Sequence, residues 1–210
     1  LASGSRYVWD KAGFDQVDPK KTPFLLGLFE PSHMQWEADR AKDQAGEPSL
    51  SEMTRKSLEM LQGSRQGYFL HVEAGRIDHG HHAGNAKRAL LDTIELAKAV
   101  KMAYEMTDPK ETLIIVTADH SHVFTIAGYP HRGNPILGLV KPVPEQDGGL
   151  PDVARDANDL TYTPLNYANG PGARNRSPTG GRPDLSHVDT SATDYKQEAI
   201  VEFKSETHGG

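Results

Sequence analysis

The order of apolar and polar residues in the first part of the chain predicts short strands and longer helices. Residues 6–9 and 23–29 are short apolar runs, which favour strands. Residues 67–72 and 112–117 are apolar runs bounded by polar or turn-forming residues, and we expect both to be buried strands. Residues 85–106, which lie between them, repeat apolar positions at nearly helical spacing. Strand, helix and strand in this order predict a parallel sheet.

A second helix is expected after Pro48. Ser51 is its expected N-cap, and Leu58 and Leu61 contribute to one apolar face. Gly63 is expected to end the helix, because glycine readily adopts the left-handed conformation that follows many helices.

The residue pattern changes after Gly128, where proline and glycine become frequent. We therefore divide the chain into an α/β region, residues 1–127, and a loop-rich region, residues 128–206. Residues 161–167 are the strand-like part of the second region, which is not expected to form a second hydrophobic core. The predicted fold class is α/β, with a mostly parallel central sheet flanked by helices.

Acidic residues and histidines follow the two predicted buried strands. The first cluster is Glu73-Ala74-Gly75-Arg76-Ile77-Asp78-His79-Gly80-His81-His82, and the second is Asp119-His120-Ser121-His122. Ligands of parallel sheets gather at the carboxyl ends of strands, where both clusters would lie. A single Asp-His pair is usually an ordinary hydrogen-bonded contact. Two clusters in one strand–helix–strand unit favour a metal site.

The spacing within the clusters suggests how they divide between ions. Asp78 and His82 are four residues apart, so a helical turn would place both on one face to hold one ion. Asp119 and His120 are adjacent, so their side chains can converge on one metal only in a loop. Glu73 precedes the turn and is expected to bind a second ion. The flanking histidines are expected to orient ligands or to reach substrate through water: His79, His81 and His122. A metal pair suits displacement at phosphorus, but this spacing equally allows a binuclear peptidase or a structural metal site.

Composition narrows the function further. The chain has 210 residues, no cysteine and a formal net charge of −6. Any metal site must therefore use His, Asp and Glu, and no nucleic-acid-binding surface is evident. No apolar run approaches the ~20 residues of a membrane span. The chain begins at Leu1 rather than methionine, and we expect it to be a piece of a longer protein.

The two clusters resemble the metal motifs of alkaline phosphatases, in the form typical of animals and related bacteria. Further matches are Gly27-Leu28-Phe29-Glu30-Pro31, Gly128-Tyr129-Pro130 with Arg132-Gly133, and Glu206-Thr207-His208. The resemblance extends over nearly the whole chain. It implies an alkaline-phosphatase-like fold in which residues 128–206 form a crown-like region. Residues 207–210 then return to the catalytic domain with the third zinc ligand.

The resemblance also implies a set of metal ligands for two zinc ions and one magnesium ion. Asp78, His82 and His208 resemble the ligands of the first zinc, and Asp119 and His120 those of the second. Glu73 resembles a magnesium ligand, and His79 a neighbour of the phosphate and magnesium. A calcium site is implied at three further residues: Phe29 through its backbone carbonyl, Glu30 and Glu47.

The implied activity is hydrolysis of phosphate monoesters to inorganic phosphate through a phosphoserine intermediate, in a periplasmic, secreted or cell-surface homodimer. The family's serine nucleophile stands in an Asp-Ser-Ala-type motif, which this chain does not contain. No catalytic nucleophile is therefore assigned here, and the serine is expected upstream. The alternatives are a non-catalytic metal- or phosphate-binding fragment, or a related phosphodiesterase or sulfatase-like hydrolase.

We accordingly expect the 210-residue chain alone not to turn over phosphomonoesters, because it lacks the attacking side chain. The measurement is hydrolysis of p-nitrophenyl phosphate by the purified chain with added zinc. Zinc-dependent turnover at a rate typical of the family would contradict the expectation.

Overall fold

In the computed structural model, residues 3–144, 152–175 and 181–209 are described. The predicted loop-rich region includes residues 145–151 and 176–180, and the predicted C-terminal return includes residue 210; these lie outside the described residues. The described chain falls into two compact units. Unit 1 comprises residues 1–77 and 90–117, and unit 2 comprises residues 78–89 and 118–210.

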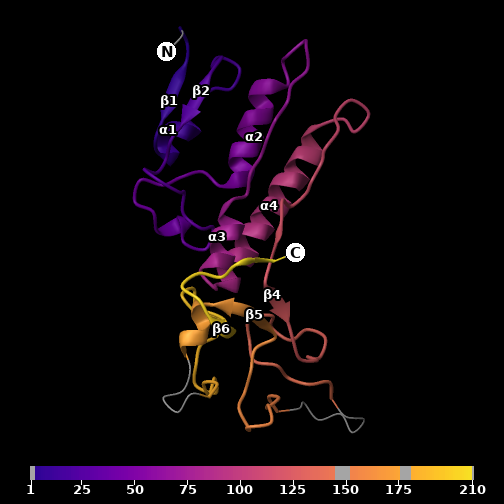
Figure 1. The fold of residues 1–210 in the computed structure, drawn as a ribbon. Helices are drawn as coiled ribbons and strands as arrows, with labels where there is room; N and C mark the ends of the chain where they lie inside the picture. Colours follow the sequence, from indigo (N-terminus) through magenta and orange to yellow (C-terminus); the bar gives the residue numbers. More distant parts are fainter. Residues whose placement is uncertain (1–2, 145–151, 176–180, 210) are drawn as a thin grey trace. The chain divides into compact units, whose positions relative to one another are not determined.

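The helices and strands follow one another along the chain, as Figure 1 shows by colour. Their bounds are β1 Arg6–Val8, α1 Lys11–Asp15, β2 Leu25–Gly27, the 3-10 helix η1 Arg40–Lys42, α2 Leu50–Leu61, α3 Arg76–His82, α4 Ala86–Met106, β3 Ser121–His122, β4 Phe124–Ile126, β5 Leu165–Gly170, η2 Pro171–Asn175, β6 Ala199–Glu202 and β7 His208–Gly209. Helices and strands in small parallel, antiparallel and mixed sheets confirm the α/β class. Among the described residues, no helix is both long and apolar enough to cross a membrane.

Unit 1 is built on a small sheet and the helix α2. β1 and β2 pair in parallel, with Tyr7 opposite Leu26 (Figure 1). Val8, Phe14 and Val17 form the buried cluster beside this sheet. Ser49, rather than the predicted Ser51, caps α2. Its side chain accepts from the backbone N–H of Glu52 while the Glu52 carboxylate accepts from the backbone N–H of Ser49, which completes a capping box.

Two predicted strands are wrong in this structure. Residues 67–72 and 112–117 belong to no strand, although the helix between them, α4, is present with nearly the predicted bounds. Phe69 is 88% exposed and Leu113 is 84% exposed. A strand forms only where a neighbour completes its ladder of hydrogen bonds. These segments have no such neighbour among the described residues, so their apolar side chains remain uncovered.

Unit 2 contains a three-stranded sheet that carries part of the candidate site. β5 lies between β4, which it pairs in antiparallel, and β6, which it pairs in parallel (Figure 1). Leu165 and Tyr167 of β5 are almost fully buried. β3 and β7 form a separate antiparallel pair in which His122 stands opposite His208. The predicted strand over residues 161–167 is therefore displaced toward the C-terminus, because residues 165–170 make the ladder.

Gly80 allows the last turn of α3 to approach the first turn of α4 closely. A Cβ at this position would lie 2.7 Å from the backbone nitrogen of Ala89 and 3.0 Å from its Cα. Real Cβ atoms do not approach backbone atoms so closely, so a larger residue would push α4 away from the histidines of α3.

We predict that Gly80→Ala destabilises the protein by about 1–3 kcal/mol, the usual cost of overpacking a close contact. The measurement is denaturant unfolding of the variant and the parent. Gly181→Ala is the matched control in the same unit, because a Cβ there would meet nothing within 4 Å. Equal stability of the two variants would show that the α3–α4 contact does not require glycine.

Candidate metal centre

One carboxylate oxygen of unit 2 lies among four imidazole rings. The Oδ1 atom of Asp78 is 3.1 Å from Nε2 of His122 and 3.3 Å from Nε2 of His208. The same oxygen is 3.5 Å from Nε2 of His82 and 3.7 Å from Nε2 of His120. The helical spacing in α3 brings Asp78 and His82 together, as predicted, and the β3–β7 pair brings in His122 and His208, with His120 directly before β3.

This arrangement fits a bound cation better than a cluster held together by hydrogen bonds. Asp78 Oδ1 is buried and has no hydrogen-bond partner among the described residues, although four ring nitrogens surround it. The Nε2 atoms of His82 and His208 approach each other to 3.0 Å. Ligand atoms of Asp78, His120, His122 and His208 all lie within 4.8 Å of one another. A carboxylate and several imidazoles directed at one point are the donor set that zinc prefers.

A second layer of side chains lies behind the ring of His122. His81 lies against His122, with ring centroids 4.6 Å apart, and its Nδ1 is 2.8 Å from the hydroxyl of Tyr167. Burial lowers the pKa of His81 to about 4 and raises the pKa of Tyr167 above its ordinary value. Both groups are therefore neutral at physiological pH, which suits a supporting role rather than a charged contact with substrate.

Asp119 occupies a different position from the predicted ligands around Asp78. Its side chain is 90% exposed, and its Oδ2 is 3.5 Å from Nε2 of His120, the nitrogen that also approaches Asp78. Two carboxylates therefore lie within 4 Å of the same ring nitrogen of His120. His79 is half-buried on α3. The structure thus brings His120 to the cluster and leaves Asp119 at its solvent side.

Glu73 belongs to unit 1, where it lines a cavity of about 90 Å³ with Asp92, Glu95 and Arg40 among other residues. Burial raises the pKa of Asp92 to about 6, although its Oδ2 accepts a hydrogen bond from the backbone N–H of Glu37 at 3.1 Å.

A second acidic cluster of unit 1 contains two of the predicted calcium ligands. Carboxylate oxygens of Glu30, Asp43 and Glu47 lie within 4.8 Å of one another. Glu47 is 2% exposed; its Oε1 accepts from the backbone N–H of Gln35 at 2.8 Å, and its buried Oε2 has no hydrogen-bond partner among the described residues. Burial raises the pKa of Glu47 to about 7, and the nearby charges of Glu30 and Asp43 add to this effect. The ring of Phe29 packs against Phe14.

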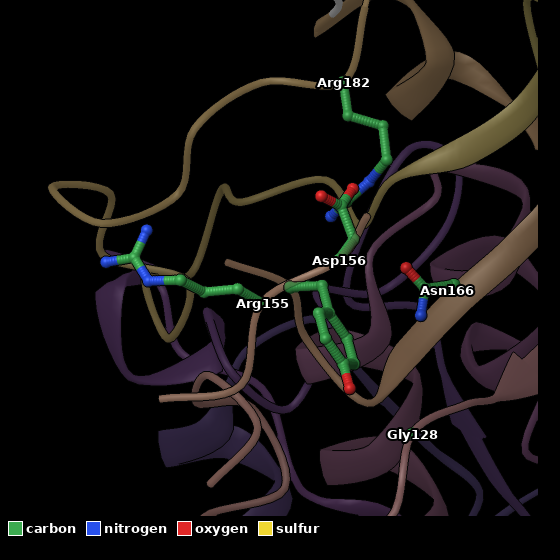
Figure 2. A pocket seen from close by; sticks show the side chains of 6 residues that line it. Gly128, Arg155, Asp156, Asn166 and Arg182 are labelled. Atoms are coloured by element: carbon green, nitrogen blue, oxygen red, sulfur yellow. The ribbon is translucent and has the colours of Figure 1, made fainter. Parts of the chain in front are cut away.

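A further cavity lies elsewhere in unit 2. It measures about 420 Å³ and is lined by Arg155, Asp156, Tyr162 and Arg182 among others (Figure 2). Figure 2 shows the side chains of Asp156 and Arg182 pointing toward one another, and Arg182 also pairs with Glu198 at 2.7 Å. The positive charge of Arg182 is therefore already balanced by protein carboxylates, so this cavity is a poorer anion site than the metal cluster.

Sequence reasoning assigned no role to two residues that the structure places at these clusters. Glu206 was noted only as part of a motif, yet its side chain is buried and bonded to His122. Asp43 was not noted at all. Neither residue had a sequence signal, because an isolated acidic residue in a polar stretch is normally solvated.

These units define an α/β protein with a carboxylate–imidazole cluster suited to a divalent metal. Comparison with known proteins gives the family: the alkaline phosphatase family model matches residues 2–210. The chain belongs to the alkaline phosphatase family. This confirms the resemblance and the alkaline-phosphatase-like α/β fold, and it identifies the chain as part of a family of phosphomonoesterases.

Individual relatives support the assignment. The chain is 45% identical to the tissue-nonspecific alkaline phosphatase of Gallus gallus over 98% of its own length and 37% of that protein. The human tissue-nonspecific isozyme is 40% identical over 98% of this chain and 36% of its own length. The crystal structure of the Thermus thermophilus alkaline phosphatase matches with a TM-score of 0.56 and 32% identity, over 62% of this chain and 27% of that one. The chain thus spans well under half the length of the curated relatives.

Proposed function

We propose that this chain contributes the metal ligands of an enzyme that hydrolyses phosphate monoesters and releases inorganic phosphate. The observation that carries the proposal is the position of Asp78 Oδ1 among four imidazole nitrogens at 3.1–3.7 Å. Membership of the alkaline phosphatase family supplies the reaction class. The chain's net charge of −6 would not attract an anionic substrate, so the positive charge must come from bound cations.

The proposed ligand assignment gives each side chain a distinct role. Asp78, His82 and His208 hold the first zinc, while Asp119 and His120 hold the second. A bound zinc pair supplies Lewis-acid polarisation of the phosphoryl group and lowers the pKa of an attacking oxygen. The exposed Asp119 carboxylate and the half-exposed His208 ring, which is 52% accessible, leave the solvent side of the cluster open to a substrate.

Three further parts of the proposal rest on the family. Glu73 binds a magnesium ion. The reaction passes through a phosphoserine intermediate, and the serine that forms it is expected upstream of this chain. The intact enzyme acts as a homodimer in the periplasm, outside the cell or at its surface. A non-catalytic metal-binding module and a related phosphodiesterase or sulfatase-like hydrolase remain the alternatives, and the substrate profile of the intact enzyme separates them.

We predict that Asp78→Ala removes the first zinc, because it deletes the oxygen around which the four rings are arranged. The measurement is zinc per protein after dialysis, by elemental analysis of the intact protein. Asp159→Ala, in an exposed ion pair with Arg155, is the control and should retain the full zinc content. An unchanged zinc content in Asp78→Ala would remove the basis of the proposed site.

We also propose that unit 1 binds calcium through Glu30, Glu47 and the backbone carbonyl of Phe29, with Asp43 as an additional ligand. Carboxylate oxygens are the ligands that calcium prefers. The buried Oε2 of Glu47, which has no hydrogen-bond partner among the described residues, is the observation that supports this site. An ion there would neutralise three carboxylates that otherwise repel one another.

The expected effect of calcium depends on pH. Without the ion the pKa of Glu47 is raised to about 7, so this carboxyl costs the fold stability increasingly as pH rises from its ordinary pKa to about 7, and the full cost is present above 7. Calcium binds the charged form and should therefore raise Tm more at pH 8 than at pH 6. Glu47→Gln should abolish the calcium effect and match or exceed the parent's stability at pH 8 without calcium.

Thermal unfolding with calcium or with a chelator at the two pH values measures this. Asp15→Asn, at the exposed pair with Lys11, is the control and should keep the calcium response. A calcium response that survives in Glu47→Gln would place the ion elsewhere.

A further inference from the structure

Glu206 joins three segments that carry rings of the metal cluster. It is 1% exposed and precedes His208 by two residues. Its Oε2 lies 2.7 Å from Nδ1 of His122, and its Oε1 accepts from the backbone N–H of Val123 at 2.8 Å. Its backbone oxygen lies 2.6 Å from Nδ1 of His82, and its backbone N–H donates to the carbonyl of His82 at 3.0 Å. One residue therefore contacts α3 and β3 and lies two residues before β7.

These contacts decide which nitrogen of each ring carries a proton. A backbone carbonyl and an ionised carboxylate only accept hydrogen bonds, so Nδ1 must donate in both His82 and His122. Nε2 of a neutral ring then keeps its lone pair. In both rings this nitrogen faces Asp78 Oδ1, at 3.5 Å for His82 and 3.1 Å for His122. The hydrogen bonds to Glu206 thus turn the lone pair of the ligand His82 toward the metal position and keep the proton off the His122 nitrogen beside Asp78.

We propose that Glu206 is a positioning residue of the metal centre. Its backbone carbonyl fixes the Nδ1–H tautomer of His82, and its buried carboxylate fixes the Nδ1–H form and the orientation of His122. This rests on the metal centre of the proposed function and adds a residue that touches neither metal nor substrate. Hydrogen bonds to the second nitrogen of such a ring increase its basicity toward a metal, and their loss costs about 10- to 100-fold in metal affinity.

Glu206→Gln tests the role of the carboxylate with almost no change of shape. The backbone N–H of Val123 can only donate, so the amide oxygen must face it and the amide N–H₂ must face His122. That group offers a proton where the parent accepts one, and His122 is driven to the Nε2–H tautomer. His122 is not one of the assigned zinc ligands, but the proton on its Nε2 then points at Oδ1 of the ligand Asp78, 3.1 Å away, and competes with the zinc for that oxygen. We expect zinc affinity to fall about 10- to 100-fold.

The experiment uses the intact protein and two measurements. Zinc affinity is measured by competition with a chromophoric chelator, and the histidine tautomers are read from ¹⁵N NMR of labelled protein. Glu198→Gln is the matched control in the same unit, because that carboxylate pairs with Arg182 rather than with a ring of the cluster. It should lower thermal stability and leave zinc affinity and tautomers unchanged.

The outcomes separate this proposal from the proposed function. If the parent binds no zinc, the metal centre itself is refuted. If the parent binds zinc and Glu206→Gln binds it equally tightly with unchanged tautomers, only the role of Glu206 is refuted. Should Glu206→Gln fail to fold, the parent spectrum still decides: a His82 or His122 ring without a proton on Nδ1 overturns the proposal.

Discussion

The arrangement of unit 2 depends on a single electrostatic constraint at Asp78. Four ring nitrogens approach its Oδ1 within 3.7 Å, and lone pairs directed at a carboxylate oxygen repel it. Positive charge at this point removes the conflict. A metal cation would satisfy the carboxylate and the rings together.

Local spacing predicted the part of this site that lies on one helix. Asp78 and His82 meet because residues four apart share a helix face, and that rule needs no knowledge of the rest of the fold. His208 could be assigned only through the family resemblance, because its approach to His82 depends on the pairing of β7 with β3. Glu206 could not be recognised, because its burial is a property of the packed unit and not of its polar neighbours in the sequence.

The difference between local patterns and contacts made only in the packed fold also explains which parts of the fold were predicted. The sequence predicted the long helix α4 because apolar residues repeat at helical spacing within the helix itself. The N-cap of α2 was misplaced by two residues because Ser49 and Ser51 are both suitable, and only the reciprocal bond with Glu52 selects Ser49. Residues 67–72 and 112–117 have strand-like composition, but a strand is defined by its partner. Among the described residues no partner reaches them, and Phe69 and Leu113 remain exposed.

The two units share a property that links their folding to cations. Each holds a buried carboxylate oxygen without a hydrogen-bond partner among the described residues: Glu47 Oε2 in unit 1 and Asp78 Oδ1 in unit 2. A buried acceptor in this state destabilises the fold unless a cation or a proton occupies the position beside it. A cation bound only by the folded chain stabilises it, so metal binding at the proposed sites would contribute to the free energy of folding in both units. The side chains that prepare the site for chemistry are therefore also those whose repulsion makes the metal-free fold less stable.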